Sequence, residues 1–439
     1  MIVRSFFCGM SLQGAGMNRT GQCSIRTGEL FMDMKELKTK INNRLKYGCD
    51  IEDYSYLENG SAVTSDGDGI RINLLISTID KSRMYGGLST AFNFFFALAN
   101  ECGFDVRIIV TNVPVTQETA DSYPDYKIVN SDSSDHKQIF DYTASGGKRP
   151  AIHLRKNDIF LATFWTTMYL ADSLRKEQKM MYGVDHPAIY LIQDYEPGFY
   201  KWSSEYMLAE STYRAGKIIA VINSNELNGY LKNFNYNFMN SYTFTPRLNR
   251  GLKEVLINST EVKRENRIII YGRPFNGRNC FSLIIAALKE AVARDDELKK
   301  WEFLSIGAEH KNIELVPGVT LVCKGKLSIA DYGNLMLGTK AGISLMCSPH
   351  PSYPPLEMAT FGVKTITNSF MTKDLSTFSP NIVSVDDPTI GNLADAVIEC
   401  CNGEEGVIDR TSGYLDDNDQ FTAIVKDIHK VLLDEISKC

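Results

Sequence analysis

The 439-residue sequence predicts an α/β protein made of two doubly wound domains that face each other across a cleft. Short apolar strands alternate with helical patterns in two separate series along the chain. Between the two series, residues 245–266 carry proline, glycine and scattered charges that interrupt the periodicity. The length points the same way, because chains beyond roughly 250–300 residues normally divide into more than one domain.

Composition narrows the class of protein. The hydrophobic fraction of 44% and the charged fraction of 23% are those of a globular protein, and the net charge of −6 argues against a general nucleic-acid partner. No apolar run reaches the ~18 residues of a membrane span. The ten cysteines include no CxxC pair and the six histidines no HxxxH or HExxH cluster. We therefore expect a reduced, cytoplasmic protein without a disulfide framework or a structural metal.

Residues 1–70 are expected to form an N-terminal extension. Residues 1–31 show no clear pattern, and Met32 or Met34 is an alternative start. Residues 34–47 predict a helix with an apolar face and a net charge of +4, from five basic residues and one acidic residue. A basic amphipathic helix binds anionic membrane surfaces, but such a helix also packs on its own protein, and both interpretations stay open.

The first domain is expected to span residues 71–250. Its first unit is a strand at 72–77, a turn with Gly86 and Gly87, a helix at 88–100 and a strand at 106–110. Paired glycines let the backbone approach a ligand at a helix N-terminus, where anions are favoured. The spacing is not that of a dinucleotide fingerprint, and the glycines also suit the turn alone.

Further βα units follow in the first domain. The strand predicted at 188–193 ends in a polar run, Gln193-Asp194-Tyr195-Glu196, and this position at the carboxyl end favours a site over a core role. The acidic pair Asp66 and Asp68 lies in a Ser/Gly-rich stretch before the first strand, so we expect a loop there and not a metal site. The remaining elements are expected as strands at 158–163 and 217–222 and helices at 166–178 and 203–215.

The second domain is expected to span residues 251–412, followed by a C-terminal segment, 413–439, that crosses back to the first domain. The helix predicted at 420–437 belongs to this last segment, and the clearest helix of the domain has Phe281, Ile284, Leu288 and Val292 at helical spacing. The predicted strands of the domain are 267–271, 301–306, 319–323, 341–346, 363–367 and 382–385.

Charged residues follow three of these strands at their carboxyl ends. Arg273 and Arg278 follow the first strand, Lys326 the third, and Tyr353 and Glu357 the fourth, where Pro355 suits the first turn of a helix. In a doubly wound sheet these loops converge on one edge. Two cations and a carboxylate there suit a nucleoside diphosphate: the cations meet the pyrophosphate, and the carboxylate accepts from ribose hydroxyls. Singly, the cations would be solvated charges and Glu357 a helix-capping acid.

Four motifs carry a resemblance to a known family. They are YLIQDYEPGFY (190–200), IIIYGRP (268–274), GKLSIADY (325–332) and SPHPSYPPLEMATFG (348–362). In this order, the chain from about residue 71 to 401 resembles glycosyltransferases of family 4 with the GT-B fold. It is more closely similar to the WsaF rhamnosyltransferases of bacterial rhamnan synthesis. The GT-B fold consists of two Rossmann-like domains.

The resemblance implies a retaining, metal-independent transfer of L-rhamnose from dTDP-L-rhamnose to a glycan or lipid-linked glycan of a growing surface polysaccharide. It implies that Arg273 and Lys326 bind the donor pyrophosphate and stabilise the negative charge that develops as the diphosphate leaves. The family usually has a second cation after the Gly-Arg pair, and Arg278 matches this position only loosely. Tyr353 and Glu357 would bind the nucleoside and sugar. Asp194 would lie on the acceptor side, as a base or as a group that orients the acceptor.

The chain departs from the family at Pro349, where an acidic residue normally stands eight positions before Glu357. The contact to the transferred sugar must therefore differ, which fits a 6-deoxy sugar. A transferase for another nucleotide sugar, a GT-B epimerase, and a nucleotide-sugar-binding module without turnover remain alternatives. We expect a cytoplasmic location, with contact to the inner face of the membrane through residues 34–47 as an open possibility.

Overall fold

The computed structural model describes residues 44–49, 51–57, 60–83, 86–145, 148–260, 263–416 and 420–438. The chain divides into two units, residues 1–58 and 59–439. In the first unit, residues 44–47 are helical and η1 (Ser55–Leu57) is a short 3-10 helix. Most of the basic helix predicted over 34–47 lies outside the described residues. No helix in the described part of the chain is long and apolar enough to cross a membrane.

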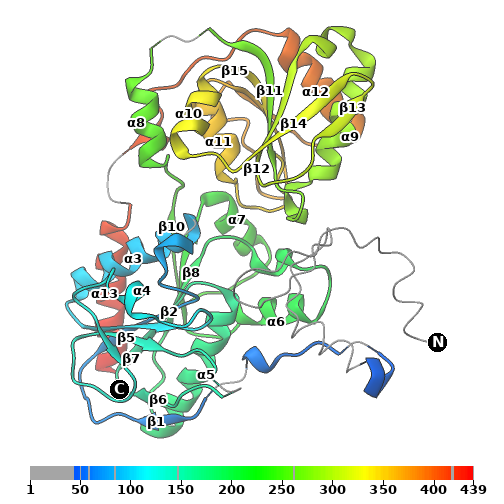
Figure 1. Cartoon of the computed structure of the whole chain (residues 1–439). Helices are drawn as coiled ribbons and strands as arrows, with labels where there is room; N and C mark the ends of the chain where they lie inside the picture. Colours follow the sequence, from blue (N-terminus) through cyan, green and yellow to red (C-terminus); the bar gives the residue numbers. More distant parts are fainter. Residues whose placement is uncertain are drawn as a thin grey trace. The chain divides into compact units, whose positions relative to one another are not determined.

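The larger unit contains two extended sheets (Figure 1). The first is parallel throughout and has eight strands in the order β10-β9-β8-β7-β2-β3-β5-β4. Its central strands are buried on both faces, so their residues are mostly apolar, and exceptions such as Arg71, Asn73 and Arg107 are buried polar side chains. The strands are β2 (Arg71–Ile76), β3 (Asp105–Val110), β4 (Lys127–Val129), β5 (Lys137–Asp141), β7 (Asp158–Ala162), β8 (Ala188–Ile192), β9 (Ile218–Asn223) and β10 (Asn240–Phe244).

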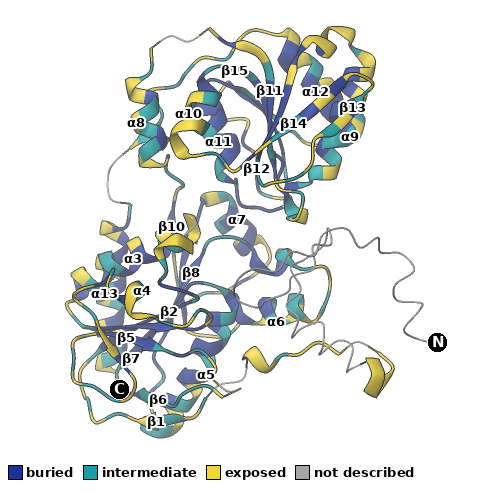
Figure 2. Ribbon diagram, viewed as in Figure 1, coloured by how far each residue is buried: buried dark blue, intermediate teal, exposed yellow. Residues whose placement is uncertain are grey.

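Helices cover both faces of this sheet, and Figure 2 shows their outer surfaces exposed while the strands between them are buried. A separate parallel pair joins β1 (Ala62–Thr64) to β6 (Ile152–Leu154). The helical segments are η2 (Lys81–Arg83), α3 (Gly86–Cys102), α4 (Gln117–Ala120), α5 (Trp165–Tyr182), η3 (Glu196–Phe199), α6 (Ser204–Thr212) and α7 (Asn225–Asn233).

The second sheet has seven strands in the order β13-β14-β12-β11-β15-β16-β17, and only the edge strand β13 is antiparallel to its neighbour. Its strands are β11 (Glu265–Gly272), β12 (Glu302–Gly307), β13 (Ile313–Val316), β14 (Val319–Gly325), β15 (Thr339–Ile343), β16 (Lys364–Asn368) and β17 (Ile382–Val385). The helical segments are α8 (Arg250–Asn258), η4 (Gly277–Asn279), α9 (Phe281–Arg294), η5 (Asp296–Lys300), α10 (Ile329–Leu337), α11 (Tyr353–Thr360), α12 (Ile390–Asn402) and η6 (Gly413–Leu415). The predicted fold class, two Rossmann-like domains of the GT-B kind, is confirmed.

The last helix, α13 (Thr422–Ser437), packs against α3 of the first sheet. Its apolar face is buried, with Ile428 and Leu432 fully shielded from solvent. The ring of Phe421, just before the helix, meets Phe94 of α3 edge to face at 5.3 Å between centroids. The chain therefore returns to the first sheet after completing the second.

The structure differs from the sequence prediction at the candidate site and at the boundary between the two series. The strand predicted over 341–346 ends at Ile343. The Ser344 N–H still donates to the Ile366 carbonyl of β16, but further along the N–H of Met346 donates to the Asn368 side chain and that of Cys347 to the Arg278 carbonyl, so the ladder is not continued. In addition, the stretch 245–266, which the sequence predicts as the break between the two series, contains the helix α8, and this helix buries Leu252 and Leu256.

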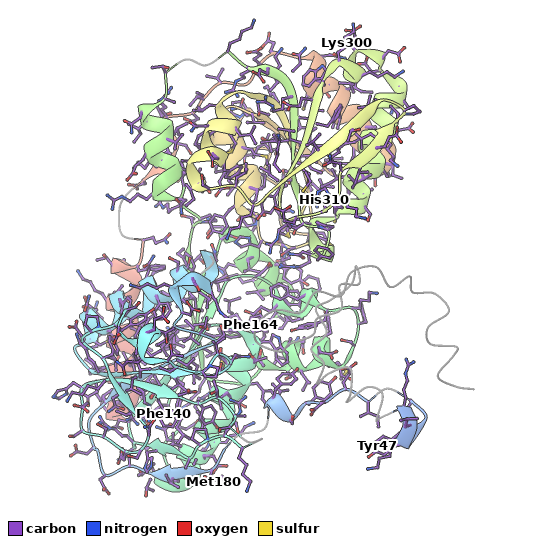
Figure 3. The ribbon with its side chains drawn as sticks, in the orientation of Figure 1. Tyr47, Phe140, Phe164, Met180, Lys300 and His310 are labelled. Atoms are coloured by element: carbon purple, nitrogen blue, oxygen red, sulfur yellow. The ribbon has the colours of Figure 1, made fainter. Side chains whose placement is uncertain are left out.

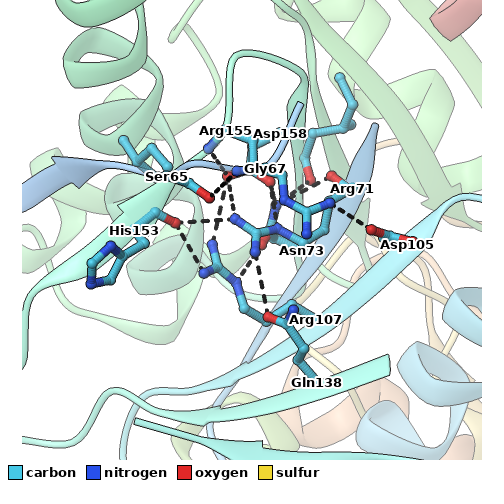
Figure 4. Close-up of polar contacts among 12 residues, drawn as sticks. Ser65, Gly67, Arg71, Asn73, Asp105, Arg107, Gln138, His153, Arg155 and Asp158 are labelled. Carbon is cyan, nitrogen blue, oxygen red and sulfur yellow. Dashed lines mark hydrogen bonds and ion pairs between the residues drawn. The ribbon is translucent and has the colours of Figure 1, made fainter. Parts of the chain in front are cut away.

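An ionic cluster holds the amino-terminal ends of three strands of the first sheet (Figure 4). Arg71 stands beside both Asp105 and Asp158 in the strand register and donates two hydrogen bonds of 2.7 and 2.8 Å to the Asp158 carboxylate. Asn73 and the backbone of Arg155 donate two more, at 2.9 and 2.8 Å. Arg71 and Asp158 are completely buried.

The charges of this cluster depend on one another. Burial alone would raise the pKa of Asp158, but Arg71 and Arg107 hold it below its usual range. Burial and the nearby Arg71 lower the pKa of Arg107 to about 9. The prediction that Asp66 and Asp68 lie in a loop is confirmed, and Gly67 between them packs directly on the Arg155 side chain.

Candidate active site

Asp194 is the point at which side chains from the two sheets meet. It lies two residues beyond β8, and its Oδ1 accepts the backbone N–H of Tyr195 at 2.8 Å. The same carboxylate forms an ion pair with Arg278, which follows β11, and accepts a hydrogen bond from the Ser348 hydroxyl, which follows β15. Two of the predicted site residues, Asp194 and Arg278, are thus brought into contact by the fold.

The loops that carry Arg278 and Ser348 are fixed to each other. The backbone N–H of Cys347 donates to the Arg278 carbonyl at 2.7 Å. The Arg278 guanidinium also lies over the Phe199 ring, 3.9 Å from its centroid, in a cation–π arrangement. Strand β11 has β12 on one side and β15 on the other, so these loops flank the point where the strand order reverses, the usual ligand position in open α/β sheets.

The predicted glycine turn lies at the same edge of the first sheet as Asp194. Gly86 and Gly87 begin α3, and the Gln193 side chain donates to the Gly87 carbonyl at 2.8 Å. A Cβ on Gly87 would come within 3.4 Å of Gln193 Oε1. The turn is therefore held against the residue that precedes Asp194.

Tyr353 also links the two sheets. Its hydroxyl accepts a hydrogen bond of 3.1 Å from the Asn223 side chain at the end of β9. Nearby, the Thr372 hydroxyl donates to the Glu226 carbonyl at 2.7 Å. Tyr353 opens α11, preceded by Ser352 with a positive φ of 68°, and Pro354 and Pro355 occupy the first turn, as predicted for Pro355.

Glu357 lies half-buried on α11 among tyrosine side chains. Burial raises the pKa of Glu357 to about 7, and the Tyr332 hydroxyl beside it acts in the opposite direction. Burial also raises the pKa of Tyr271. The positive charge of Arg273 lowers this pKa, and the negative charge of Glu357 raises it. Arg273, just beyond β11, and Glu357, on the helix α11 that follows β15, therefore both lie close to the same phenol.

The backbone beneath Arg273 is closely packed. A Cβ on Gly272 would come within 2.1 Å of the Ser305 hydroxyl, so only glycine fits there. Ser305 is in turn 2.6 Å from Nε2 of His310, the histidine labelled in Figure 3. Arg273 itself is exposed at the end of β11.

Lys326 is exposed and follows β14 at the same edge of the sheet. Only β12 separates β14 from β11, which places the strands of Lys326 and Arg273 about 10 Å apart. The preceding Gly325 has φ of 62°, and a Cβ there would collide with the Glu309 carboxylate. Glu309 is therefore a further acidic group at this edge.

The fold adds residues that the sequence patterns did not single out. These are Ser348 and Lys373. His350, a polar residue of the loop that the sequence places after the fourth strand, is almost completely buried, as is Lys373. Nδ1 of His350 accepts the Ser352 N–H at 3.0 Å, while its Nε2 has no hydrogen-bond partner among the described residues. Nζ of Lys373 donates to the Met346 carbonyl at 2.6 Å, and burial lowers the pKa of Lys373 to about 8. A lysine in a turn between two strands carries no motif, so only its burial reveals it.

Two family models match this chain, one in each of the two sheet domains. Residues 71–225 match the model of the WsaF N-terminal domain, and residues 266–398 match that of the WsaF C-terminal domain. Together the two matches span about two thirds of the chain. This chain belongs to the WsaF-like glycosyltransferase family. These matches do not bear on membership of family 4, which stays a prediction.

One curated relative is the O-antigen biosynthesis protein RfbC of Myxococcus xanthus, 32% identical over 213 residues that make up 48% of this chain and 15% of RfbC. The chain thus spans a small part of that protein. Among solved structures, sucrose-phosphate synthase (tll1590) from Thermosynechococcus elongatus is 12% identical with a TM-score of 0.47, covering 84% of this chain and 100% of that one. The α,α-trehalose 6-phosphate synthase from Burkholderia multivorans is 9% identical with a TM-score of 0.48, covering 84% of this chain and 93% of that one.

The raised pKa of Glu357 predicts a pH-dependent gain in stability for Glu357→Gln. A carboxyl whose pKa is about 7 when folded, against about 4.3 unfolded, stabilises the protein below pH 4 and loses that contribution as the pH rises through 7. The isosteric amide carries no charge, so the variant should unfold with a free energy about 2 kcal/mol higher relative to wild type at pH 8 than at pH 5. Urea unfolding at the two pH values measures the difference, and an offset independent of pH would contradict the assignment.

Proposed function

We propose that this chain is a GT-B glycosyltransferase that moves L-rhamnose from dTDP-L-rhamnose to a growing surface polysaccharide, with retention and without an essential metal. The observation that carries the proposal is the polar edge of the second sheet, where Arg273, Lys326 and Glu357 follow β11, β14 and β15. Membership of the WsaF-like family supports the transferase activity, and the name of the RfbC relative supports a role in polysaccharide synthesis. The choice of dTDP-L-rhamnose rests on the motif resemblance.

In this mechanism Arg273 and Lys326 bind the donor pyrophosphate. As the sugar–phosphate bond breaks, negative charge develops on the leaving diphosphate, and two fixed cations stabilise that charge more strongly than they stabilise the bound donor. Glu357, ionised above pH 7, accepts hydrogen bonds from the ribose hydroxyls. Tyr353 and the turn at Gly86 and Gly87 complete the donor contacts.

Asp194 acts on the acceptor side. Its carboxylate is already bound by Arg278, Ser348 and the Tyr195 N–H, so most of its lone pairs are occupied. A carboxylate in these surroundings is better suited to orienting an acceptor hydroxyl than to removing its proton. Because Arg278 and Ser348 come from the second sheet, the same contacts would hold the acceptor side against the donor side during transfer.

The acceptor in this proposal is a glycan or a lipid-linked glycan, and the protein acts in the cytoplasm. The basic residues of 34–47 supply contact with the inner face of the membrane, where lipid-linked acceptors are anchored. This part of the proposal is tested by co-sedimentation with anionic vesicles. Loss of binding after the basic residues of 34–47 are replaced by glutamine would support it, and unchanged binding would contradict it.

Release of nucleoside diphosphate by the purified protein tests the function. A panel of dTDP-, UDP- and GDP-sugars is supplied with a rhamnose-containing acceptor, with and without EDTA. Release from dTDP-L-rhamnose alone, unchanged by EDTA, is the expected result. Release from a UDP- or GDP-sugar would retain the transferase and overturn the donor. Tight nucleotide binding without release from any donor would favour a binding module.

A further inference from the structure

Trp202 is the most unusual residue on the surface of the first domain. It is 93% exposed, yet its indole lies parallel to the Tyr206 ring of α6, at 5.7 Å between centroids and 6° between planes. Met207 beside it is 73% exposed. A large apolar ring held flat and open to water offers a preformed face at low entropic cost. We call Trp202, Tyr206 and Met207 the aromatic platform.

The aromatic platform is connected to Asp194 through a chain of contacts. The Tyr206 hydroxyl is 3.2 Å from the Tyr195 hydroxyl, and the Tyr195 N–H binds the Asp194 carboxylate. The Tyr195 hydroxyl is itself anchored by Tyr236, at 2.9 Å. The platform is therefore fixed to the residue that the proposed mechanism places at the acceptor hydroxyl.

The segment between Asp194 and Trp202 is held in place by side-chain contacts. Phe199 stacks on Phe164, labelled in Figure 3, at 6.0 Å between centroids and 25° between planes. The Tyr200 hydroxyl accepts from the Trp165 indole at 2.8 Å. Phe199 also lies beneath Arg278. The same short segment thus touches the candidate active site at one end and presents the platform at the other.

We propose that the aromatic platform binds the acceptor glycan chain, several sugar units away from the unit that receives the new sugar. This rests on the proposed transferase function. Pyranose rings have an apolar face of C–H groups that stacks on aromatic rings, and the methyl group of a 6-deoxy sugar adds to this face. A second binding point on an anchored segment would hold a growing chain and favour longer acceptors over short ones.

The charges around the platform favour a neutral glycan over an anionic membrane. Helix α6 contains Glu205 and Glu210 and no lysine or arginine. Surfaces that insert into anionic membranes normally combine apolar residues with clustered basic ones. Lys201, directly before Trp202, is a single exposed cation and not a basic cluster, so a stacked pair of rings flanked by one lysine, serines and carboxylates matches one sugar ring better than a bilayer.

The test compares Trp202→Ala with Met180→Ala, a control that removes a 72% exposed apolar side chain from α5 of the same domain. With a rhamnan oligosaccharide as acceptor, Trp202→Ala should raise the acceptor KM roughly 10-fold and leave kcat and the donor KM unchanged. With a simple rhamnoside the variant should match wild type. Equal KM values for the oligosaccharide in wild type and Trp202→Ala would overturn the proposal while leaving the transferase function intact.

Direct binding separates the platform from catalysis. The indole fluorescence of wild type should change on titration with the rhamnan oligosaccharide, and the change should be lost in Trp202→Ala, whether or not any donor is turned over. If instead the oligosaccharide has no effect and Trp202→Ala loses binding to phosphatidylglycerol vesicles, the platform is a membrane contact and the glycan proposal is wrong.

Discussion

Replacing Arg273 by alanine is expected to lower the rate of sugar transfer by about 10²-fold or more. The guanidinium stands at the carboxyl end of β11, on a backbone that Gly272 and Ser305 hold in place. In the proposed mechanism it neutralises charge that appears on the diphosphate only as the donor bond breaks. The alanine variant loses a fixed positive charge that stabilises the transition state more than the bound nucleotide sugar. We therefore expect kcat to fall more than the affinity for the nucleotide sugar.

The controls for this variant separate charge from geometry. Arg294→Ala removes a half-exposed arginine from α9 of the same domain, where it pairs only with the exposed Asp395 among the described residues, and should leave the rate unchanged. Arg273→Lys keeps the charge but loses the planar fork, so it should recover part of the activity. The rate is measured as nucleoside diphosphate release at saturating donor. Near-normal turnover by Arg273→Ala would show that this residue is a surface charge.

Asp158→Asn is expected to destabilise the first domain by about 3–5 kcal/mol, although it lies at the opposite end of the strands from the candidate active site. The buried carboxylate accepts two hydrogen bonds from Arg71 and further ones from Asn73 and the backbone of Arg155. The amide has nearly the same shape but no charge and only one acceptor oxygen. The buried guanidinium groups of Arg71 and Arg107 would lose their shared counter-ion.

Urea unfolding measures the loss of stability, and hydrogen exchange of the amides in β2 and β7 shows whether it is confined to the first sheet. Asp395→Asn is the matched control, since Asp395 is 60% exposed and its ion pair with Arg294 should contribute less than about 1 kcal/mol. A small effect of Asp158→Asn, comparable to that of the control, would mean that Asp105 and backbone carbonyls suffice to balance the arginines.

Much of the fold follows from local patterns. The strands of a parallel sheet are buried on both faces, so β8 is an uninterrupted apolar run and β11 contains one at residues 268–271, while glycines and N-cap residues mark the helices between the strands. The short strands β4 and β13 were missed because each has only three or four residues and partly exposed side chains. Helix α8 was missed because a nine-residue helix with a narrow apolar face resembles a linker.

The residues of the candidate site also fall into two groups: those that local patterns predict, and those that only folding brings together. Local sequence patterns were enough to predict that Arg273, Lys326 and Glu357 follow parallel strands, because strand ends and a Pro-rich helix start are local features. The contacts of Asp194 with Arg278, 84 residues away, and with Ser348, 154 residues away, are visible only in the folded chain. The tertiary structure alone decided that Lys373 is buried beneath the Ser348 loop and that Trp202 is left open to water. Such contacts depend on how distant loops come together, and neither side-chain periodicity nor residue spacing encodes that.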